Sequence, residues 1–204
     1  MEYIIVIISC YLLGSISPAM IAGKKLRNID IRDVNSKNAG TSNIAMTLGL
    51  KWGIAVGVSD ILKGLIPVVI LRIIFPENDI IWVVGGISAI LGHIYPFHMG
   101  FNGGKGTASF GVVLLGIAPV FALVLAVVFT IVLFLSDYIA ISTLVVLIVS
   151  PLGLYFLDFQ ITSIILISSY SLLSFYKHYP NYKRILLKQE IGLRKAFRKW
   201  KEAN

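Results

Sequence analysis

The sequence predicts an all-α, polytopic membrane protein of about seven transmembrane helices. The 204 residues are 57% hydrophobic and 14% charged, with a mean hydropathy of +0.86, which is more apolar surface than a soluble domain of this size buries. The apolar stretches are also long and lack the alternation typical of a half-buried strand. Since a helix satisfies its own backbone hydrogen bonds within lipid, these two observations favour membrane helices.

An apolar stretch of about 20 residues is long enough to cross a bilayer. The longest one, Ala108–Leu135, contains Pro119 near its middle and is predicted to form two shorter helices. An undivided stretch would place the loop at 136–138 on the opposite side, so this break is a testable choice. The other predicted spans are Tyr3–Ala22, Trp52–Phe75, Ile80–Met99, Ile139–Phe156 and Ile161–Tyr176. No internal repeat or low-complexity linker is visible, and residues 1–204 are predicted to form a single domain.

Positive charge is concentrated beside the apolar stretches. Of the 18 Lys and Arg residues, six lie in Lys24–Lys51 and nine in the tail 177–204, with two acids in each segment. This clustering fits the positive-inside rule and contact with anionic membrane lipids, and it argues against a nucleic-acid partner. With seven spans, these segments share one side, predicted cytoplasmic, with residues 102–106 and Asp137. The basic tail is predicted to be a solvated topogenic segment.

A glycine-rich segment, Phe101–Thr107, leads directly into an apolar helix. Glycines allow successive backbone N–H groups to converge into a concave anion site, and the helix start adds its positive dipole end. Lys105 adds a full charge. A phosphate is therefore a natural occupant, although a plain turn between two spans explains the glycines equally well.

Further polar residues flank or enter the spans. The small polar run Asp33–Asn43 either caps helices and holds turns, which is slightly favoured, or lines a ligand pocket. His93, at the end of the third span, is expected to be a structural hydrogen-bonding residue. Asp60 and Lys63 are charges three residues apart inside the second span and are expected to form an ion pair.

Three residues of the tail follow one another at helical spacing. His178, Asn181 and Arg184 are each three residues apart, so they can share one face of a helix. A solvated amphipathic surface helix explains the same spacing, and the sequence by itself favours that interpretation.

Taken together, these segments resemble the bacterial acyl-phosphate-dependent glycerol-3-phosphate acyltransferases, the PlsY family. Each motif alone is weak, whereas the ordered set at matching separations is specific and covers nearly the whole chain. The motifs are Gly14-Ser15-Ile16-Ser17-Pro18, the Ser36/Asn38/Gly40/Asn43 spacing, Asp60-x-x-Lys63-Gly64-x-x-Pro67, Gly92-His93-x-Tyr95-Pro96, Phe101-x-Gly103-Gly104-Lys105-Gly106, and His178-x-x-Asn181-x-x-Arg184 with Glu190.

The resemblance implies seven helices in the plasma membrane and an active site at the cytoplasmic face. It implies acyl transfer from an acyl phosphate to the 1-hydroxyl of glycerol 3-phosphate, giving lysophosphatidate and phosphate, without a metal, a cofactor or a thioester donor. A functional link to an acyl-phosphate-producing enzyme follows. An acyl phosphate is already activated, so the protein needs mainly to align two anions and screen their repulsion.

The resemblance also implies the roles of individual residues. The catalytic residues are Ser36, Lys105, His178 and Asn181. The residues that bind the substrate phosphate are Gly103, Gly104, Lys105, Gly106 and Thr107. The residues that form the pocket are Asn38, Gly40, Asn43, His93, Arg184 and Glu190.

The sequence departs from the family pattern at six positions. Met46, Asn102, Asp137 and Ala140 stand where the family has Arg, Lys, Arg and Ser, and Lys37 and Lys188 stand where it has Gly. Loss of two cationic contacts weakens acceptor binding by roughly a hundredfold, which Lys37 offsets in part as a new cation. Two alternatives therefore remain: an acyl-phosphate-dependent transferase with another acceptor, and a non-catalytic relative that binds lipid-pathway intermediates.

Overall fold

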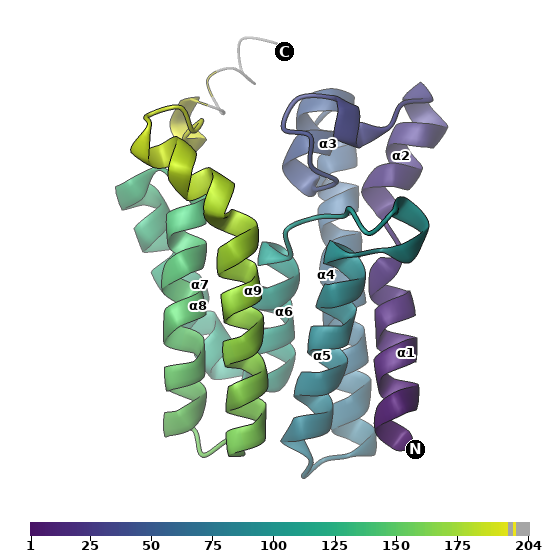
Figure 1. Cartoon of the computed structure of the whole chain (residues 1–204), viewed down its shortest axis with the longest axis vertical. Coiled ribbons are helices and arrows are strands. Elements are labelled where there is room, and N and C mark those ends of the chain that lie inside the picture. The colour runs from purple at the N-terminus through teal and green to yellow at the C-terminus, as the bar shows by residue number, and fades with distance from the viewer. Residues whose placement is uncertain (196–197, 199–204) are drawn as a thin grey trace. The chain divides into compact units, whose positions relative to one another are not determined.

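The computed structural model describes residues 1–195 and residue 198, and in this part of the chain every regular element is a helix (Figure 1). The α-helices are α1 Glu2–Ser15, α2 Pro18–Arg27, α3 Thr41–Leu48, α4 Leu50–Ile74, α5 Asp79–Ile94, α6 Thr107–Ile117, α7 Pro119–Ser136, α8 Ile139–Phe156 and α9 Ile161–Leu186. Two 3-10 helices, η1 Ile31–Asp33 and η2 Phe97–Met99, lie in the connections. The all-α prediction is confirmed.

Most of these helices have the length and composition of membrane spans. Within the described residues, five helical stretches are long and apolar enough to cross a membrane, and Thr107–Ile117 is a shorter apolar helix. The polar C-terminal part of α9 distinguishes it from these five. The membrane class is thus confirmed, and seven remains an approximate count.

The chain forms two compact units, Met1–Ile117 (unit 1) and Ala118–Asn204 (unit 2). The boundary coincides with the predicted break, because α6 ends at Ile117 and α7 begins at Pro119. Proline has no N–H with which to continue a helix but fits its first position, so Pro119 ends one helix and starts the next. The prediction that residues 1–204 are one domain stays a prediction.

The first predicted span, Tyr3–Ala22, is interrupted. α1 ends at Ser15 and α2 begins at Pro18. The Ser17 hydroxyl caps α2 by accepting a hydrogen bond from the Met20 N–H at 3.3 Å. The predicted span Tyr3–Ala22 lies within the helical stretch Glu2–Arg27, which is long and apolar enough to cross a membrane, and Pro18 starts a new helix inside it.

In two other predicted spans, the α-helix ends at a different residue. The predicted span Ile80–Met99 matches the candidate membrane span Asp79–Met99, although its α-helix α5 ends at Ile94 and the separate turn η2 completes the stretch. By contrast, α9 continues through Pro180 to Leu186 and takes in the first ten residues of the predicted tail 177–204. Residues 196–197 and 199–204 of that tail lie outside the described residues.

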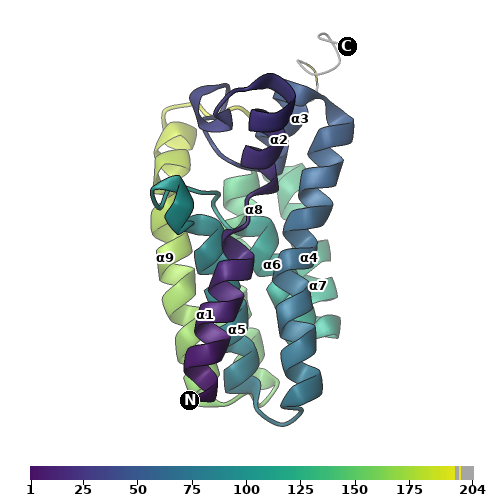
Figure 2. The ribbon, with the colours of Figure 1, turned by 90° about the vertical axis from the view of Figure 1, so that its right-hand side faces the viewer.

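In unit 1, α1 and α5 lie side by side (Figures 1 and 2). A Cβ atom on Gly14 would collide with the backbone of Ala89, and one on Gly92 would collide with the Tyr11 carbonyl. The Tyr11 hydroxyl also donates to the Tyr95 carbonyl at 2.7 Å. Small residues let membrane helices approach closely, where van der Waals contact replaces the missing hydrophobic driving force.

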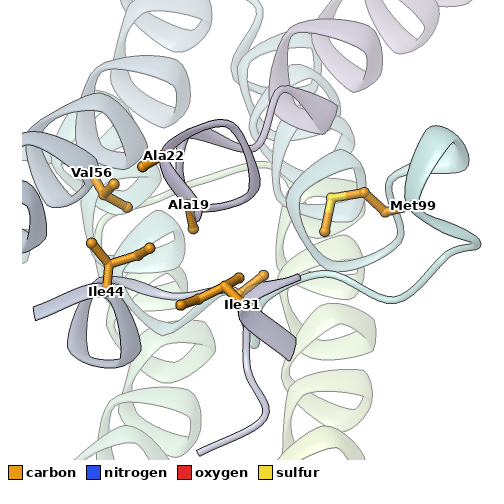
Figure 3. Close-up of a cluster of buried hydrophobic side chains, with 7 residues drawn as sticks. Ala19, Ala22, Ile31, Ile44, Val56 and Met99 are labelled. Carbon is orange, nitrogen blue, oxygen red and sulfur yellow. The ribbon is translucent and has the colours of Figure 1, made fainter. Parts of the chain in front are cut away.

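The polar connection between α2 and α4 rests on an apolar cluster (Figure 3). Ile31 of η1 and Ile44 of α3 are completely buried there, and Met99 of η2 joins them. The other members are Ala19, Ala22, Ala39 and Val56. The segment that carries the polar motif is therefore a packed part of unit 1.

In unit 2, α8 packs against both α7 and α9. A Cβ atom on Gly153 of α8 would collide with the ring of Phe121 on α7. α7 leaves most of its surface exposed, as expected of a helix that faces lipid.

We predict that Gly14→Ala lowers the free energy of unfolding by about 1–3 kcal/mol, because the added methyl group overpacks the α1–α5 contact. Gly111→Ala is the matched control, since a Cβ atom on Gly111 of α6 meets nothing within 4 Å. It should leave stability unchanged or raise it by up to about 1 kcal/mol through helix propensity. Unfolding in mixed detergent micelles measures both, and equal effects would contradict the packing argument.

Candidate functional site

Asn43, in the first turn of α3, fixes the shape of the polar segment that precedes it. The side chain is fully buried. Its Nδ2 donates to the carbonyls of Ile31, Asn38 and Val34 at 2.7, 3.0 and 3.2 Å. For Asn43, the interpretation that these polar residues hold turns is confirmed, and the direct role of Asn38 and Gly40 in a pocket stays a prediction.

Ser36 and Lys37 are exposed at the outer part of this segment. The backbone on either side of Ser36 is left-handed, with φ of 48° at Asn35 and 53° at Lys37. Asn35 Nδ2 donates to Thr47 Oγ1 at 2.9 Å and so fastens the segment to α3. The Ser36 hydroxyl therefore lies on an ordered loop and is accessible to a ligand.

Arg32 ties this segment to the connection that precedes the glycine-rich segment. Its Nη1 donates to the carbonyls of Met99 and Asn102 at 2.7 and 3.2 Å. Asp30 accepts from Arg32 Nη2 at 2.6 Å and from its backbone N–H at 2.9 Å. The hydrogen bond from the guanidinium holds the pKa of the Asp30 carboxyl below its ordinary value. Sequence reasoning missed both residues. The one feature of the sequence that could have indicated them is the presence of an Asp and an Arg two positions apart.

Gly103 and Gly104 rest against the C-terminal end of α5. Their N–H groups donate to the carbonyls of Ile94 and His93 at 2.9 and 3.1 Å. A Cβ atom on Gly103 would collide with the His93 carbonyl, and one on Gly104 would collide with the His93 imidazole at Nε2. The expectation that these two N–H groups converge on a phosphate was wrong, because they satisfy carbonyl groups at the end of a helix.

The remaining part of the glycine-rich segment leads into α6. Lys105 is half-buried between the buried residues Gly104 and Gly106, and α6 begins at Thr107. Gly106 has φ of 81°, a conformation that glycine adopts without strain. A lysine two residues before a helix N-terminus is suited to binding an anion. Phosphate binding by this segment stays a prediction, now centred on Lys105, Gly106 and Thr107.

The expected ion pair in the second span is present. Lys63 Nζ lies 2.8 Å from Asp60 Oδ1, and both side chains are buried. The same oxygen lies 3.7 Å from His93 Nδ1. His93 therefore contacts a buried charge with one edge of its ring and Gly104 with the other, which supports its expected structural role.

In unit 2, the carboxylate of Glu190 joins two residues of α9. Asn181 Nδ2 donates to Glu190 Oε1 at 2.7 Å, and Arg184 Nε donates to Glu190 Oε2 at 2.6 Å. His178 and Asn181 are 3% and 8% exposed, whereas Arg184 is exposed. The favoured interpretation of this stretch as a solvated surface helix was wrong for His178 and Asn181, because α9 continues and buries both.

A tight turn after α9 brings Glu190 back to the helix. Lys188 has φ of 56°, and the N–H groups of Gln189 and Glu190 both donate to the Arg184 carbonyl, at 2.8 and 3.2 Å. A left-handed residue just beyond the last turn commonly ends a helix, and glycine is the usual choice. Here a lysine takes that conformation.

The loop between α7 and α8 holds Asp137, where the sequence lacks the expected Arg. The chain beyond Glu190 returns to this loop, with the N–H groups of Leu193 and Arg194 donating to Asp137 at 2.8 and 2.9 Å. Arg194 Nη2 donates to the Phe134 carbonyl at 2.7 Å. The guanidinium of Arg194, a residue that sequence reasoning did not single out, thus lies at the end of α7 and 4.0 Å from Asp137 Oδ1.

The predicted site residues therefore fall into two groups, one in each unit. Unit 1 holds Ser36, Asn38, Gly40, Asn43, His93, Gly103, Gly104, Lys105, Gly106 and Thr107. Unit 2 holds His178, Asn181, Arg184 and Glu190. Within each unit the structure links the segments by side-chain hydrogen bonds, through Arg32 in unit 1 and Glu190 in unit 2.

Comparison with known proteins identifies one family. The family model of glycerol-3-phosphate acyltransferase matches residues 4–188. Glycerol-3-phosphate acyltransferase 1 of Oceanobacillus iheyensis is 37% identical over 209 residues, covering 98% of this chain and 99% of its own. The glycerol-3-phosphate acyltransferase of Bacillus subtilis is 35% identical over 186 residues, covering 91% of this chain and 95% of its own.

Solved structures give the same result. The glycerol 3-phosphate form of PlsY, an integral membrane glycerol 3-phosphate acyltransferase, is 30% identical and superposes with a TM-score of 0.87. It covers 95% of this chain and 96% of its own. The lysophosphatidic acid form of PlsY has a TM-score of 0.84 at 29% identity, over 94% of this chain and 95% of its own.

We predict that Arg32→Met speeds hydrogen exchange of the N–H groups of residues 99–104, because the guanidinium no longer holds two carbonyls of this connection. The expected increase is about tenfold, which corresponds to one hydrogen bond to a charged group. Exchange is measured by mass spectrometry in detergent. Arg27→Met, a change at an exposed arginine of α2, is the control and should leave these residues unaffected.

We also predict that Lys188→Gly raises the free energy of unfolding by about 0.5–1 kcal/mol, because glycine adopts the left-handed backbone of this turn more readily than lysine. Lys188→Ala removes the same charge without relieving the backbone and should give no gain. Equal gains from both substitutions would point to charge instead of backbone conformation.

Proposed function

The chain belongs to the glycerol-3-phosphate acyltransferase family, and we propose that it takes the acyl group from an acyl phosphate and transfers it to the 1-hydroxyl of glycerol 3-phosphate. It is an acyltransferase of phospholipid synthesis and a membrane protein. The products are lysophosphatidate and phosphate. We place the reaction in the plasma membrane, at its cytoplasmic face, and expect a functional link to an enzyme that produces acyl phosphate.

The observation that carries this proposal is the position of Lys105. Lys105 precedes Thr107, the first residue of α6, by two positions, and it follows two glycines that have no room for a Cβ atom. In the proposed reaction the hydroxyl oxygen bonds to the acyl carbon, the C–O bond to phosphate breaks, and the hydroxyl proton leaves with the phosphate. A positive charge and a helix N-terminus stabilise the phosphate as negative charge develops on it.

We assign contact with the acceptor to the exposed Ser36 hydroxyl and to Asn181, whose side chain is oriented by Glu190. His178 and Glu190 are assigned to shaping the pocket. The glycerol 3-phosphate and lysophosphatidic acid forms of PlsY support this choice of acceptor and product.

The membrane orientation is supported by the charge distribution within unit 1. Arg32 holds the basic segment Lys24–Lys51 next to the connection at 97–102. At the other end of the same helices, Asn78 Nδ2 lies 3.4 Å from the Tyr3 hydroxyl, so the turn with Glu77 lies beside the N-terminus. Basic segments on one side and acidic ones on the other fit the positive-inside rule.

A transferase with a different acceptor is the second candidate. Met46, where the family has Arg, is 49% exposed on α3 and offers no charge to a phosphate. Ala140, where the family has Ser, is buried at the start of α8. Arg194 Nε lies 4.0 Å from Asp137 Oδ1 and offsets the negative charge of that residue, which favours retention of an anionic acceptor.

We predict that the purified protein forms lysophosphatidate from acyl phosphate and glycerol 3-phosphate, and that Lys105→Ala lowers kcat by about 100- to 1000-fold through loss of charge stabilisation. Lys51→Ala, at an exposed lysine at the start of α4, is the control and should retain activity. Product formation is followed by phosphate release and by mass spectrometry. Turnover with an acyl thioester but not with acyl phosphate would refute the proposed donor.

An acceptor series separates the two candidates. Glycerol 3-phosphate is compared with glycerol and with other phosphorylated polyols at equal concentration. We expect glycerol 3-phosphate to have the highest kcat/KM of the series. If glycerol 3-phosphate instead had the lowest kcat/KM, the second candidate would be favoured.

A further inference from the structure

Unit 1 buries two full charges inside a membrane span. Asp60 and Lys63 of α4 are 4% and 8% exposed, and their charged atoms lie 2.8 Å apart. Buried ion pairs add little net stability, because desolvation offsets their attraction, and apolar residues of similar size often serve as well or better. Charged residues within a span are therefore a sign of function.

Lys63 also reaches the break between α1 and α2. Its Nζ donates to the Ile16 carbonyl at 2.7 Å. In a continuous helix this carbonyl would accept from Met20, but the Met20 N–H donates to the Ser17 hydroxyl instead. Lys63 thus supplies the donor that the break removed and fixes the position of the break relative to α4.

Asp60 connects this pair to His93 on the last turn of α5. One carboxylate oxygen faces both Lys63 Nζ at 2.8 Å and His93 Nδ1 at 3.7 Å. The opposite edge of the imidazole lies against Gly104, leaving no room there for a Cβ atom. The His93 carbonyl accepts the Gly104 N–H, so both the side chain and the main chain of His93 support this glycine.

We propose that Asp60, Lys63 and His93 form a positioning network that holds the segment Gly103–Lys105 in register with the α1–α2 break. The network runs from the Ile16 carbonyl through Lys63 and Asp60 to His93 and ends on Gly104, one residue before Lys105. These are positioning residues, since they act on the ammonium group of Lys105 through the glycines.

The catalytic consequence rests on the proposed function. If Lys105 stabilises the departing phosphate, a shift of its backbone raises the barrier to transfer more than it weakens substrate binding. Loss of the network should therefore lower kcat with little change in KM. A network that served only folding would change the midpoint of unfolding and leave the kcat of the folded protein intact.

The central test replaces the ion pair with apolar side chains of similar size, Asp60→Leu with Lys63→Met. The matched control is Arg72→Met, on the same helix. Arg72 Nη1 likewise donates to the carbonyl of a helix end, Gly116, at 2.7 Å, but it has no contact with the network. Thermal unfolding, hydrogen exchange at residues 103–105, and kcat and KM for both substrates are measured for the full-length protein in detergent.

For the double variant we expect a folded protein in which exchange at residues 103–105 is about tenfold faster. We expect its kcat to fall by about 10- to 100-fold, with KM within about threefold of the original. Arg72→Met should lower the unfolding midpoint without changing exchange at residues 103–105 or the kcat of the folded protein. A folded double variant with unchanged exchange and unchanged kcat would overturn the proposal.

Two substitutions at His93 keep the proposal testable if the double variant does not fold. His93→Asn keeps an amide near Asp60 and removes the edge that packs on Gly104, whereas His93→Gln reaches Gly104 but not Asp60. Both should speed exchange at residues 103–105, and unchanged exchange in both would overturn the proposal. If the wild-type protein shows no acyl transfer, the proposed function fails, while the exchange measurements still decide the positioning network.

Discussion

The end of α5 sets the position of the glycine-rich segment. Gly103 and Gly104 lie so close to His93 of α5 that neither position has room for a Cβ atom. Both glycines donate their N–H groups to the last carbonyls of α5. In a membrane such carbonyls need a partner within the protein. The two glycines thus satisfy carbonyl groups at the end of α5, and the chain then continues through Lys105 to the start of α6.

The same requirement explains where unit 1 places three of its cations. Lys63 donates to the carbonyl of Ile16 at the α1–α2 break, and Arg72 donates to that of Gly116 at the end of α6. Arg32 does the same for Met99 beside η2. Each cation lies where the regular helical pattern stops and a carbonyl loses its usual donor. These side chains therefore satisfy carbonyl groups that the interrupted helices leave without a backbone donor.

In unit 2, the carboxylate of Glu190 holds the C-terminal part of α9 and the turn that follows it. Glu190 holds Asn181 and Arg184 with its two oxygens, and the left-handed turn at Lys188 brings it into reach. The orientation of the Asn181 amide, which we assign to the acceptor, therefore depends on a residue nine positions later in the chain. Loss of Glu190 would leave a buried amide without this partner and an arginine without its counter-ion.

The sequence by itself determined the helical membrane class, the break at Pro119, the ion pair of Asp60 and Lys63, and the family. These follow from composition, from the missing N–H of proline, from the proximity of residues three apart on a helix, and from an ordered set of motifs. Only the tertiary structure decided that the Gly103 and Gly104 N–H groups face a helix end, that Arg32 joins two segments, and that α9 continues through Pro180 to bury His178 and Asn181. The physical reason is that local spacing fixes which residues can share a helix, whereas the partner of a buried donor or carbonyl is chosen by packing between segments far apart in the chain.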